Sequence, residues 1–304
     1  MTEQTLQWID LCDPDEATLR ATLPAGIHDL TVIRLLRPAR EDHEPRPRME
    51  ARGNYVFGVL SFPVVDGECV SQEIDVVATL DRLVTVRKTP VGGRDHIDLA
   101  AVRASAERLG ATPGLALYML FDEVAERFLD VVDNFDTTID DLEDHVTEWE
   151  SGRIRTQISS TRHDILHVRR LLAPTRDAAR AILDDRVELD GEITLFPRDV
   201  ELHFADAYDK LLRATDGLDL SRDLLAGVRD FHQAEVANDQ NEVMKRLTVI
   251  ASVLLLPTLI VGVYGQNLKG GPEFNWAHGY WWSWGLIVVT TLAQLWYFRR
   301  KKWI

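Results

Sequence analysis

The 304-residue chain has only two cysteines, Cys12 and Cys69, and fewer basic than acidic residues. Two cysteines are too few for a disulfide framework or a thiolate zinc site, and this usage fits a reducing compartment. With 34 Lys and Arg against 49 Asp and Glu, the formal net charge is -15. Nucleic-acid binding needs clustered basic side chains, so we expect no nucleic-acid partner. The first residues show no basic segment followed by an apolar run, and no signal peptide is expected.

The chain also lacks the common patterns of nucleotide binding and catalysis. A Gly-x-x-x-x-Gly-Lys sequence is absent, which disfavours ATP-driven pumping. His163 and His167 have the i, i+4 spacing of a zinc protease, but Asp164 stands where that motif has Glu. The pair lies in an arginine-rich segment without an evident third ligand, so we interpret both histidines as surface residues. We expect no enzyme activity.

Two uncharged apolar stretches lie near the carboxyl end. Residues 247–264 hold no charged side chain, and residues 280–298 are similar and precede the basic tail of residues 299–304. An α-helix rises about 1.5 Å per residue, so each stretch can cross a hydrocarbon core of about 30 Å. A buried helix of a soluble domain can have the same composition, but two adjacent stretches with charged flanks favour transmembrane helices.

The positive charges around these stretches predict their orientation. Lys245 and Arg246 precede the first stretch, whereas the connecting loop, residues 265–279, contains only Lys269 and Glu273 as charged residues. By the positive-inside rule both termini lie in the cytoplasm and the loop lies outside. We therefore expect a multi-pass protein of the cell membrane with a large cytoplasmic part.

Residues 1–112 are predicted to form a cytoplasmic α/β domain. A short helix is expected after Asp13, with Pro14 at its first position and Glu16 completing a capping box. Residues 37–52 are charged and are predicted to form a loop, and a further helix is expected over residues 95–109. Runs rich in β-branched and aromatic residues predict strands at residues 6–9, 30–36, 55–62, 74–80 and 83–87.

Residues 113–196 are predicted to form a helical hairpin. Its first helix has apolar residues three or four apart and carries many carboxylates on its other faces. Ser151-Gly152 is expected to separate it from a basic helix over residues 157–183. The carboxylates form either an ordinary solvated face or a surface that attracts cations.

A long helix is predicted over residues 197–264. Its first part, the stalk of residues 197–246, continues into the first transmembrane helix of residues 247–264. Unbroken, it would be on the order of 100 Å long. A periodic helix of that length normally has bundle partners, so we expect an oligomer.

One face of the first transmembrane helix carries a stripe of small, polar and apolar residues. If copies of this helix surround an axis, Thr258 and the carbonyl near Gly262 would offer oxygen to a narrow path, and leucines would form apolar constrictions. Alternatively, Thr258 and Gly262 only permit close helix packing. The stripe comprises Asn241, Met244, Leu247, Ala251, Leu255, Thr258 and Gly262.

Several motifs resemble the CorA family of divalent-cation channels. They are residues 241–250 (Asn-Glu-Val-Met-Lys-Arg-Leu-Thr-Val-Ile), Pro257-Thr258, residues 261–267 (Val-Gly-Val-Tyr-Gly-Gln-Asn), Pro272-Glu273 and residues 297–303 (Tyr-Phe-Arg-Arg-Lys-Lys-Trp). The amino-terminal Trp8-Ile9-Asp10-Leu11 also matches that family's layout. The resemblance covers nearly the whole chain and is strongest near its carboxyl end.

The resemblance implies a funnel-shaped homopentamer in the lipid bilayer that imports magnesium passively, with cobalt or nickel as further substrates. The family's outer-mouth signature, Gly-Met-Asn, corresponds here to Gly265-Gln266-Asn267. Asn267 would place amide oxygens around the entrance, which suits an ion usually held through its hydration shell. Glu273 resembles the family's acidic loop residue, which would concentrate cations near the mouth.

The resemblance also implies regulation by magnesium. Asp206 matches a stalk aspartate that pairs with a carboxylate of the neighbouring α/β domain, with Asp95 or Asp98 as candidate partners here. Asp230 matches an acidic residue near the cytoplasmic pore exit. Two carboxylates repel until a cation bridges them, which would hold the channel closed. Magnesium is thus expected as substrate and regulatory ligand, with no organic cofactor.

Two other readings remain open. The related ZntB branch shares the expected fold and pentamer but moves zinc. A membrane-anchored scaffold without transport is a further alternative, although an anchor would not need the stripe on the first transmembrane helix.

Overall fold

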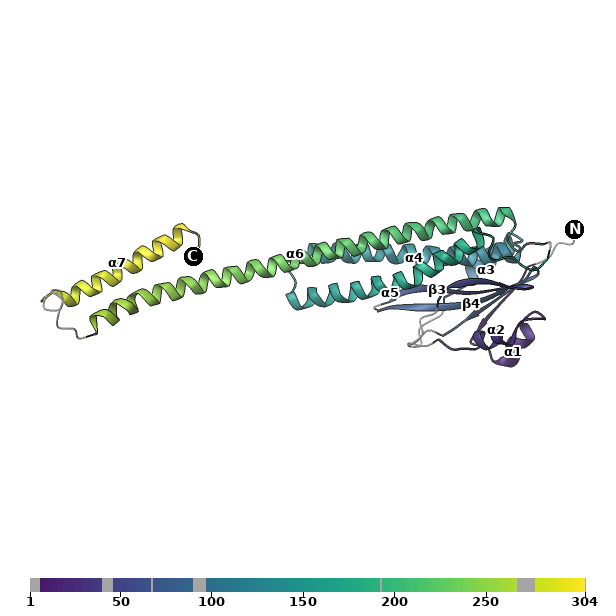
Figure 1. The fold of residues 1–304 in the computed structure, drawn as a ribbon, viewed down its shortest axis with the longest axis horizontal. Coiled ribbons are helices and arrows are strands. Elements are labelled where there is room, and N and C mark those ends of the chain that lie inside the picture. The colour runs from purple at the N-terminus through teal and green to yellow at the C-terminus, as the bar shows by residue number, and fades with distance from the viewer. Residues whose placement is uncertain are drawn as a thin grey trace. The chain divides into compact units, whose positions relative to one another are not determined.

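The computed structural model describes residues 6–39, 46–66, 68–89, 97–191, 193–266 and 277–303. The chain divides into two compact units, residues 1–229 and residues 230–304. The first unit holds a sheet and helices, and the second holds the end of a long helix and one further helix (Figure 1).

The first unit is built on a five-stranded sheet of order β1-β5-β4-β3-β2. β1 pairs with β5 in parallel, and the remaining neighbours are antiparallel. The α/β class predicted for this region is confirmed. The strands are β1 (Gln7–Cys12), β2 (Arg48–Arg52), β3 (Tyr55–Asp66), β4 (Glu68–Ala78) and β5 (Arg82–Arg87).

Helices cover both faces of this sheet. Side chains alternate along a strand, so β3 sends Tyr55, Phe57 and Val59 to one core and Val56 and Leu60 to another. α1 (Glu16–Thr22) and α2 (Asp29–Leu35) pack on the first face. The second face is covered by α3 (Ala100–Arg108), α4 (Pro113–Asp144) and α5 (Ser151–Leu183) (Figure 1). A sheet with both faces covered explains why its central strands are almost continuously apolar.

The strand predicted over residues 30–36 is wrong, because this segment forms α2. The β-branched run Thr31-Val32-Ile33 favours a strand by composition. Burial follows a helix instead: Thr31, Val32 and Leu35 are buried, whereas Leu30 and Ile33 are exposed. A half-buried strand would have alternated its exposed and buried positions.

Two boundary predictions in the α/β region are also wrong. Asp15, and not Asp13, caps α1, because its Oδ1 accepts a hydrogen bond from Thr18 N at 2.7 Å. Asp13 has a φ of 41° and instead accepts from Thr89 N at 3.2 Å. The loop predicted over residues 37–52 ends in β2, an edge strand whose charged composition hides it.

The helical hairpin is present with a different turn. α4 ends at Asp144 and α5 already begins at Ser151, so Ser151-Gly152 does not interrupt the helices. The turn is filled by Trp149, which stacks on His145 with ring centroids 4.8 Å apart. The Arg153 guanidinium lies over the Trp149 ring, 3.8 Å from its centroid. The helix predicted from residue 95 begins at Ala100, and Asp95 lies outside the described residues.

The predicted long helix is confirmed as α6 (Arg198–Tyr264), which has 67 residues. Its part in the first unit buries residues three and four apart in strict alternation, which is the 3.5-residue period of a coiled-coil seam. The seam packs in the core of this unit, while Leu202 and Leu224 of the same helix are exposed. The buried positions are Val200, Phe204, Ala207, Leu211, Ala214, Leu218, Ser221, Leu225 and Val228.

The second unit contains the remainder of α6 and α7 (Gly279–Arg300). Among the described residues, α6 is the one helix that is long and apolar enough to cross a membrane, with a mean hydropathy of 2.3 over its best window. α7 covers the second predicted span and carries no charged residue before Arg299. Its four tryptophans and two tyrosines before that point reduce its hydropathy without adding charge.

Candidate ion pathway

The predicted pore stripe lies on an exposed face of α6 in the second unit. α7 lies on the other side: Val249 and Ile260 are buried, and Gln294 Nε2 donates to Ser252 O at 3.3 Å. A helix turns about 100° per residue, so Val249 and Ile260 lie about 180° and 200° around α6 from Thr258. α7 therefore leaves the stripe uncovered. The exposed members are Asn241, Met244, Leu247, Ala251, Leu255, Thr258 and Gly262.

Thr258 and Gly262 are suited to an open path. The Thr258 hydroxyl donates to Leu254 O at 2.7 Å, which leaves its oxygen lone pairs able to face a cation or its water. Among the described residues, a Cβ placed on Gly262 would meet no side chain, and no backbone beyond its own helix turn, within 4 Å. Packing against this part of the protomer thus gives no reason for glycine here, and close approach would concern a second copy.

The predicted filter begins where α6 ends. Gly265 N donates to Val261 O at 2.8 Å and Gln266 N to Val263 O at 3.4 Å, which closes the last turn. The carboxyl end of a helix carries a partial negative charge of about half an electron, which favours a cation beside it. Asn267 and Glu273 lie outside the described residues.

A hollow of about 670 Å³ adjoins Asp206 in the first unit. Asp206 is exposed, and two further carboxylates of α6, Asp209 and Asp216, line the same hollow. Tyr118 of α4 contributes an aromatic wall. Carboxylates gathered on one side of a helix repel each other and attract a cation.

Lys210 also lines this hollow, and its ammonium group is paired with two carboxylates of α4. Lys210 Nζ lies 2.7 Å from Asp122 Oδ1 and 2.5 Å from Glu126 Oε1. Although burial opposes it, hydrogen bonding to these two carboxylates raises the pKa of the Lys210 ammonium. Burial, followed by the negative charges of Asp122 and Asp206, raises the pKa of the Tyr118 phenol. Both groups therefore keep their ordinary neutral-pH charge states beside Asp206.

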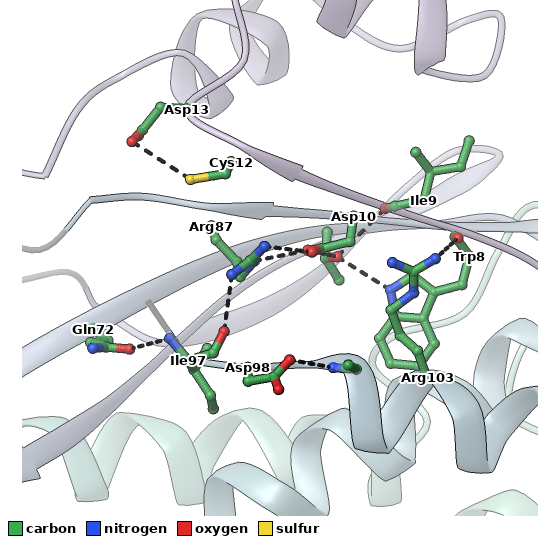
Figure 2. A network of polar contacts seen from close by, with 12 residues as sticks. Trp8, Ile9, Asp10, Cys12, Asp13, Gln72, Arg87, Ile97, Asp98 and Arg103 are labelled. Carbon is green, nitrogen blue, oxygen red and sulfur yellow. Dashed lines mark hydrogen bonds and ion pairs between the residues drawn. The ribbon is translucent and has the colours of Figure 1, made fainter. Parts of the chain in front are cut away.

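Asp98, a candidate partner of Asp206, lies in a segment anchored to the sheet (Figure 2). Its Oδ1 accepts a hydrogen bond at 2.8 Å from the backbone N–H of Ala100, the first residue of α3. The segment is held because Arg87 of β5 pairs with Asp10 of β1 at 2.8 Å and donates to Ile97 O at 3.0 Å. Asp98 is exposed despite this anchoring, which leaves its second oxygen accessible.

The other candidate ligands are dispersed. Asp230 is exposed on α6 at the start of the second unit. His163 is exposed on α5 beside a different hollow, with Asp164. Within the described ranges of the single chain, no three His, Cys, Asp or Glu side chains are placed together to hold a metal ion. A site shared between copies, as expected for Asp206, draws ligands from a second chain.

Some residues near these sites do not stand out in the sequence. Asp209 and Asp216 share the hollow of Asp206, and their spacing along α6 was the available sign. Gln294 is the one amide side chain of α7, and its hydrogen bond to Ser252 O is a polar contact between α6 and α7. The salt bridge of Lys210 with α4 had no sequence sign, because its partner lies 88 residues away.

Comparison with known proteins assigns this architecture to a family. The family model described as CorA-like Mg2+ transporter protein matches residues 3–300, nearly the whole chain. The chain belongs to the CorA family. It is similar to the protein YfjQ of Bacillus subtilis, with 27% identity over 97% of this chain and 89% of the relative. It is also 27% identical to the cobalt/magnesium transport protein CorA of Thermotoga maritima, over 92% of this chain and 77% of the relative.

Solved CorA-type structures share the fold. The CorA magnesium transporter of Methanocaldococcus jannaschii superposes with a TM-score of 0.76 and 18% identity, covering 98% of this chain and 91% of that one. The cytoplasmic domain of ZntB from Vibrio parahaemolyticus gives a TM-score of 0.59 and 12% identity, covering 76% and 88%. This CorA-family chain is accordingly a metal-ion transport protein of the membrane.

Proposed function

We propose that this protein is a passive magnesium channel in which five copies place their α6 helices around a central pore. The observation that carries the proposal is the stripe from Asn241 to Gly262, which stays exposed on the face of α6 that α7 does not cover. An exposed apolar and polar stripe inside a membrane needs either lipid or a partner helix. Its small residues and the Thr258 oxygen suit a helix bundle around water.

The outer entrance is formed by Gly265-Gln266-Asn267 in this proposal. Magnesium releases its water reluctantly, so neutral amide and carbonyl oxygens can hold the hydrated ion without trapping it. The negative ends of five helices would add to this attraction. Glu273 in the outer loop would raise the local cation concentration.

Both α6 and α7 cross the membrane in the proposed arrangement, with both termini in the cytoplasm. Lys245, Arg246 and the basic tail then lie on the same side. A negative-inside potential contributes roughly 2.3 kcal/mol per charge per 100 mV, or about twice that for a divalent ion. This driving force needs no nucleotide hydrolysis.

Internal magnesium closes the channel through the hollow at Asp206. Asp206, Asp209 and Asp216 bring three carboxylates to this hollow, against Arg213 and against Lys210, whose charge is paired with carboxylates of α4. A carboxylate of a neighbouring copy, Asp98 or Asp95, would complete a bridged site there. Asp230 would lie nearer the inner end of the pore.

The second candidate is zinc transport. The fold likeness to the ZntB cytoplasmic domain supports it. The two candidates differ in the ion that permeates, and not in the architecture they require.

Ion flux into liposomes tests the proposal. The purified full-length protein is reconstituted with ion-sensitive dyes, and magnesium, cobalt, nickel and zinc are compared. We expect magnesium entry that Asn267→Ala abolishes or strongly reduces. Zinc entry without magnesium entry would establish the alternative, and equal magnesium flux in the variant would remove the assigned filter.

A further inference from the structure

A groove lies between α6 and the carboxyl end of the chain, within the second unit. It measures about 740 Å³, within the usual range of 300 to 1,000 Å³ for ligand pockets. Val249, Val253 and Leu295 are among its apolar lining residues. Lys245 and Lys302 bring ammonium groups to the same groove from opposite walls.

The end of the chain is folded back to form one wall. Trp303 N donates to Phe298 O at 3.0 Å and Lys302 N to Arg299 O at 3.1 Å. These are the two hydrogen bonds of a Schellman motif, and the Trp303 ring stacks on Phe298 with centroids 5.8 Å apart. Lys302 occupies the left-handed position of this motif with a φ of 56°, where glycine is usual. The motif therefore fixes both Trp303 and the Lys302 side chain at the groove.

The charge of the groove is unbalanced. Its lining contains three cationic side chains, Lys245, Arg246 and Lys302, but among the lining residues only Glu242 is acidic. Arg246 lies 3.3 Å from Glu242, which accounts for one of these cations. The two lysines leave a net positive charge above an apolar floor.

We propose that this groove binds an anionic phospholipid, with its phosphate among Lys245, Arg246 and Lys302 and an acyl chain along Val249 and Leu295. A basic pocket between transmembrane helices at the cytoplasmic surface recognises such headgroups. A soluble anion would make no use of the apolar floor. The inference rests on the proposed membrane position of α6 and α7, but not on the ion that permeates.

Two variants remove the charge while preserving the fold. Lys302→Gly takes away one ammonium and places at the left-handed position the residue that the Schellman motif prefers. Lys245→Gln removes the other lysine on an exposed helix face. Lys301→Gln is the matched control, because Lys301 carries the same charge next to Lys302 but does not line the groove.

Binding is measured on the full-length protein in detergent by native mass spectrometry during titration with dioleoyl phosphatidylglycerol, and with dioleoyl phosphatidylcholine for comparison. A basic residue near an anionic membrane surface contributes enough to change affinity about five-fold. We expect Lys302→Gly and Lys245→Gln each to weaken phosphatidylglycerol binding about five-fold and the double variant about 25-fold. Lys301→Gln should retain wild-type binding.

Several results would overturn the inference. They are equal binding of both lipids, equal loss in Lys301→Gln and in Lys302→Gly, complete displacement of the lipid by equimolar inorganic phosphate, and loss of lipid as copies associate. Displacement by phosphate would show that the groove is a site for soluble anions. Loss of lipid as copies associate would show that the groove is a contact between copies. Magnesium flux is measured separately in liposomes, so its failure would refute the channel while leaving the lipid result intact.

Discussion

A buried ion cluster between α2 and the sheet gives the strongest stability prediction. Lys88 is 3% exposed and its Nζ lies 2.6 Å from Glu73 Oε1 and 2.6 Å from Asp75 Oδ2. Asp75 is fully buried, and Arg34 approaches Glu73 at 3.3 Å. Burial raises the pKa of Asp75 to about 7, against the opposing attraction of Lys88. Lys88 thus compensates two carboxylates that have little access to water.

Replacing Lys88 with methionine keeps much of its volume and removes the compensation. Breaking a buried ion pair by removing one partner costs about 3–5 kcal/mol. Native domains are stable by about 5–15 kcal/mol, so this is a large share of the total. Because Lys88 lowers the Asp75 pKa, its loss raises that pKa further. Protonation then removes the uncompensated charge, and the destabilisation should be smaller at pH 6 than at pH 8.

Urea unfolding of the full-length protein in detergent, followed by circular dichroism at both pH values, measures the effect. Arg20→Met is the control, because Arg20 pairs with Asp29 at 3.0 Å on the surface, where the side chains are 48% and 78% exposed. Such a pair contributes about 0–1 kcal/mol. A Lys88→Met variant no less stable than Arg20→Met, or one that is equally destabilised at both pH values, would refute this reasoning.

Three further predictions concern single positions. The raised Asp75 pKa means that the native state holds a proton which the unfolded state, with a pKa near 3.8, releases. The free energy of unfolding of the wild-type protein should therefore fall by on the order of 4 kcal/mol as pH rises from about 4 to about 7. The Asp75→Asn variant should lack this pH dependence in the same unfolding assay. Gly114→Ala should lower stability by about 1–3 kcal/mol, because the added Cβ would lie 2.0 Å from Leu195 O; an unchanged melting temperature would contradict this. Asp206→Ala should weaken the protection from protease that magnesium gives. Asp223→Ala, which removes another exposed carboxylate of α6, should leave this protection unchanged. Equal protection in both variants would exclude Asp206 from channel closure.

Much of the helical architecture follows directly from the sequence. Pro113 marks the start of α4 and Gly265 the end of α6, because proline fits a first helical turn and glycine commonly follows a last one. The long helix and the position of α7 follow from apolar content and charge boundaries. The central strands are equally visible as β-branched runs.

The remaining differences arise where tertiary contacts decide between similar local choices. Asp13 and Asp15 are both plausible caps, and the pairing of Asp13 with Thr89, which follows β5, selects Asp15. The segment of α2 has strand composition, but packing against Tyr55 and its neighbours requires a helix. The buried partners of Lys88 depend on strand register, which no local pattern reveals.

The candidate ion pathway could be predicted only in part from the sequence, because tertiary contacts decide the rest. The stripe on α6 follows from helical periodicity alone, whereas its exposure depends on where α7 packs. The hollow at Asp206 and the groove at Lys302 depend on contacts between distant segments and on one left-handed residue. The spacing of residues along the sequence does not show which of them act through such contacts.

The central claim is that the stripe of α6 faces a water-filled path between copies. Its most direct test compares Thr258→Cys on the stripe with Leu259→Cys, an exposed position about 100° away, in a chain whose Cys12 and Cys69 are replaced by serine. A charged methanethiosulfonate reagent is added to liposomes containing each variant, and magnesium flux is recorded. The account predicts that modification blocks flux through Thr258→Cys and leaves Leu259→Cys conducting. Equal block at both positions, or flux through modified Thr258→Cys at the wild-type rate, would contradict it.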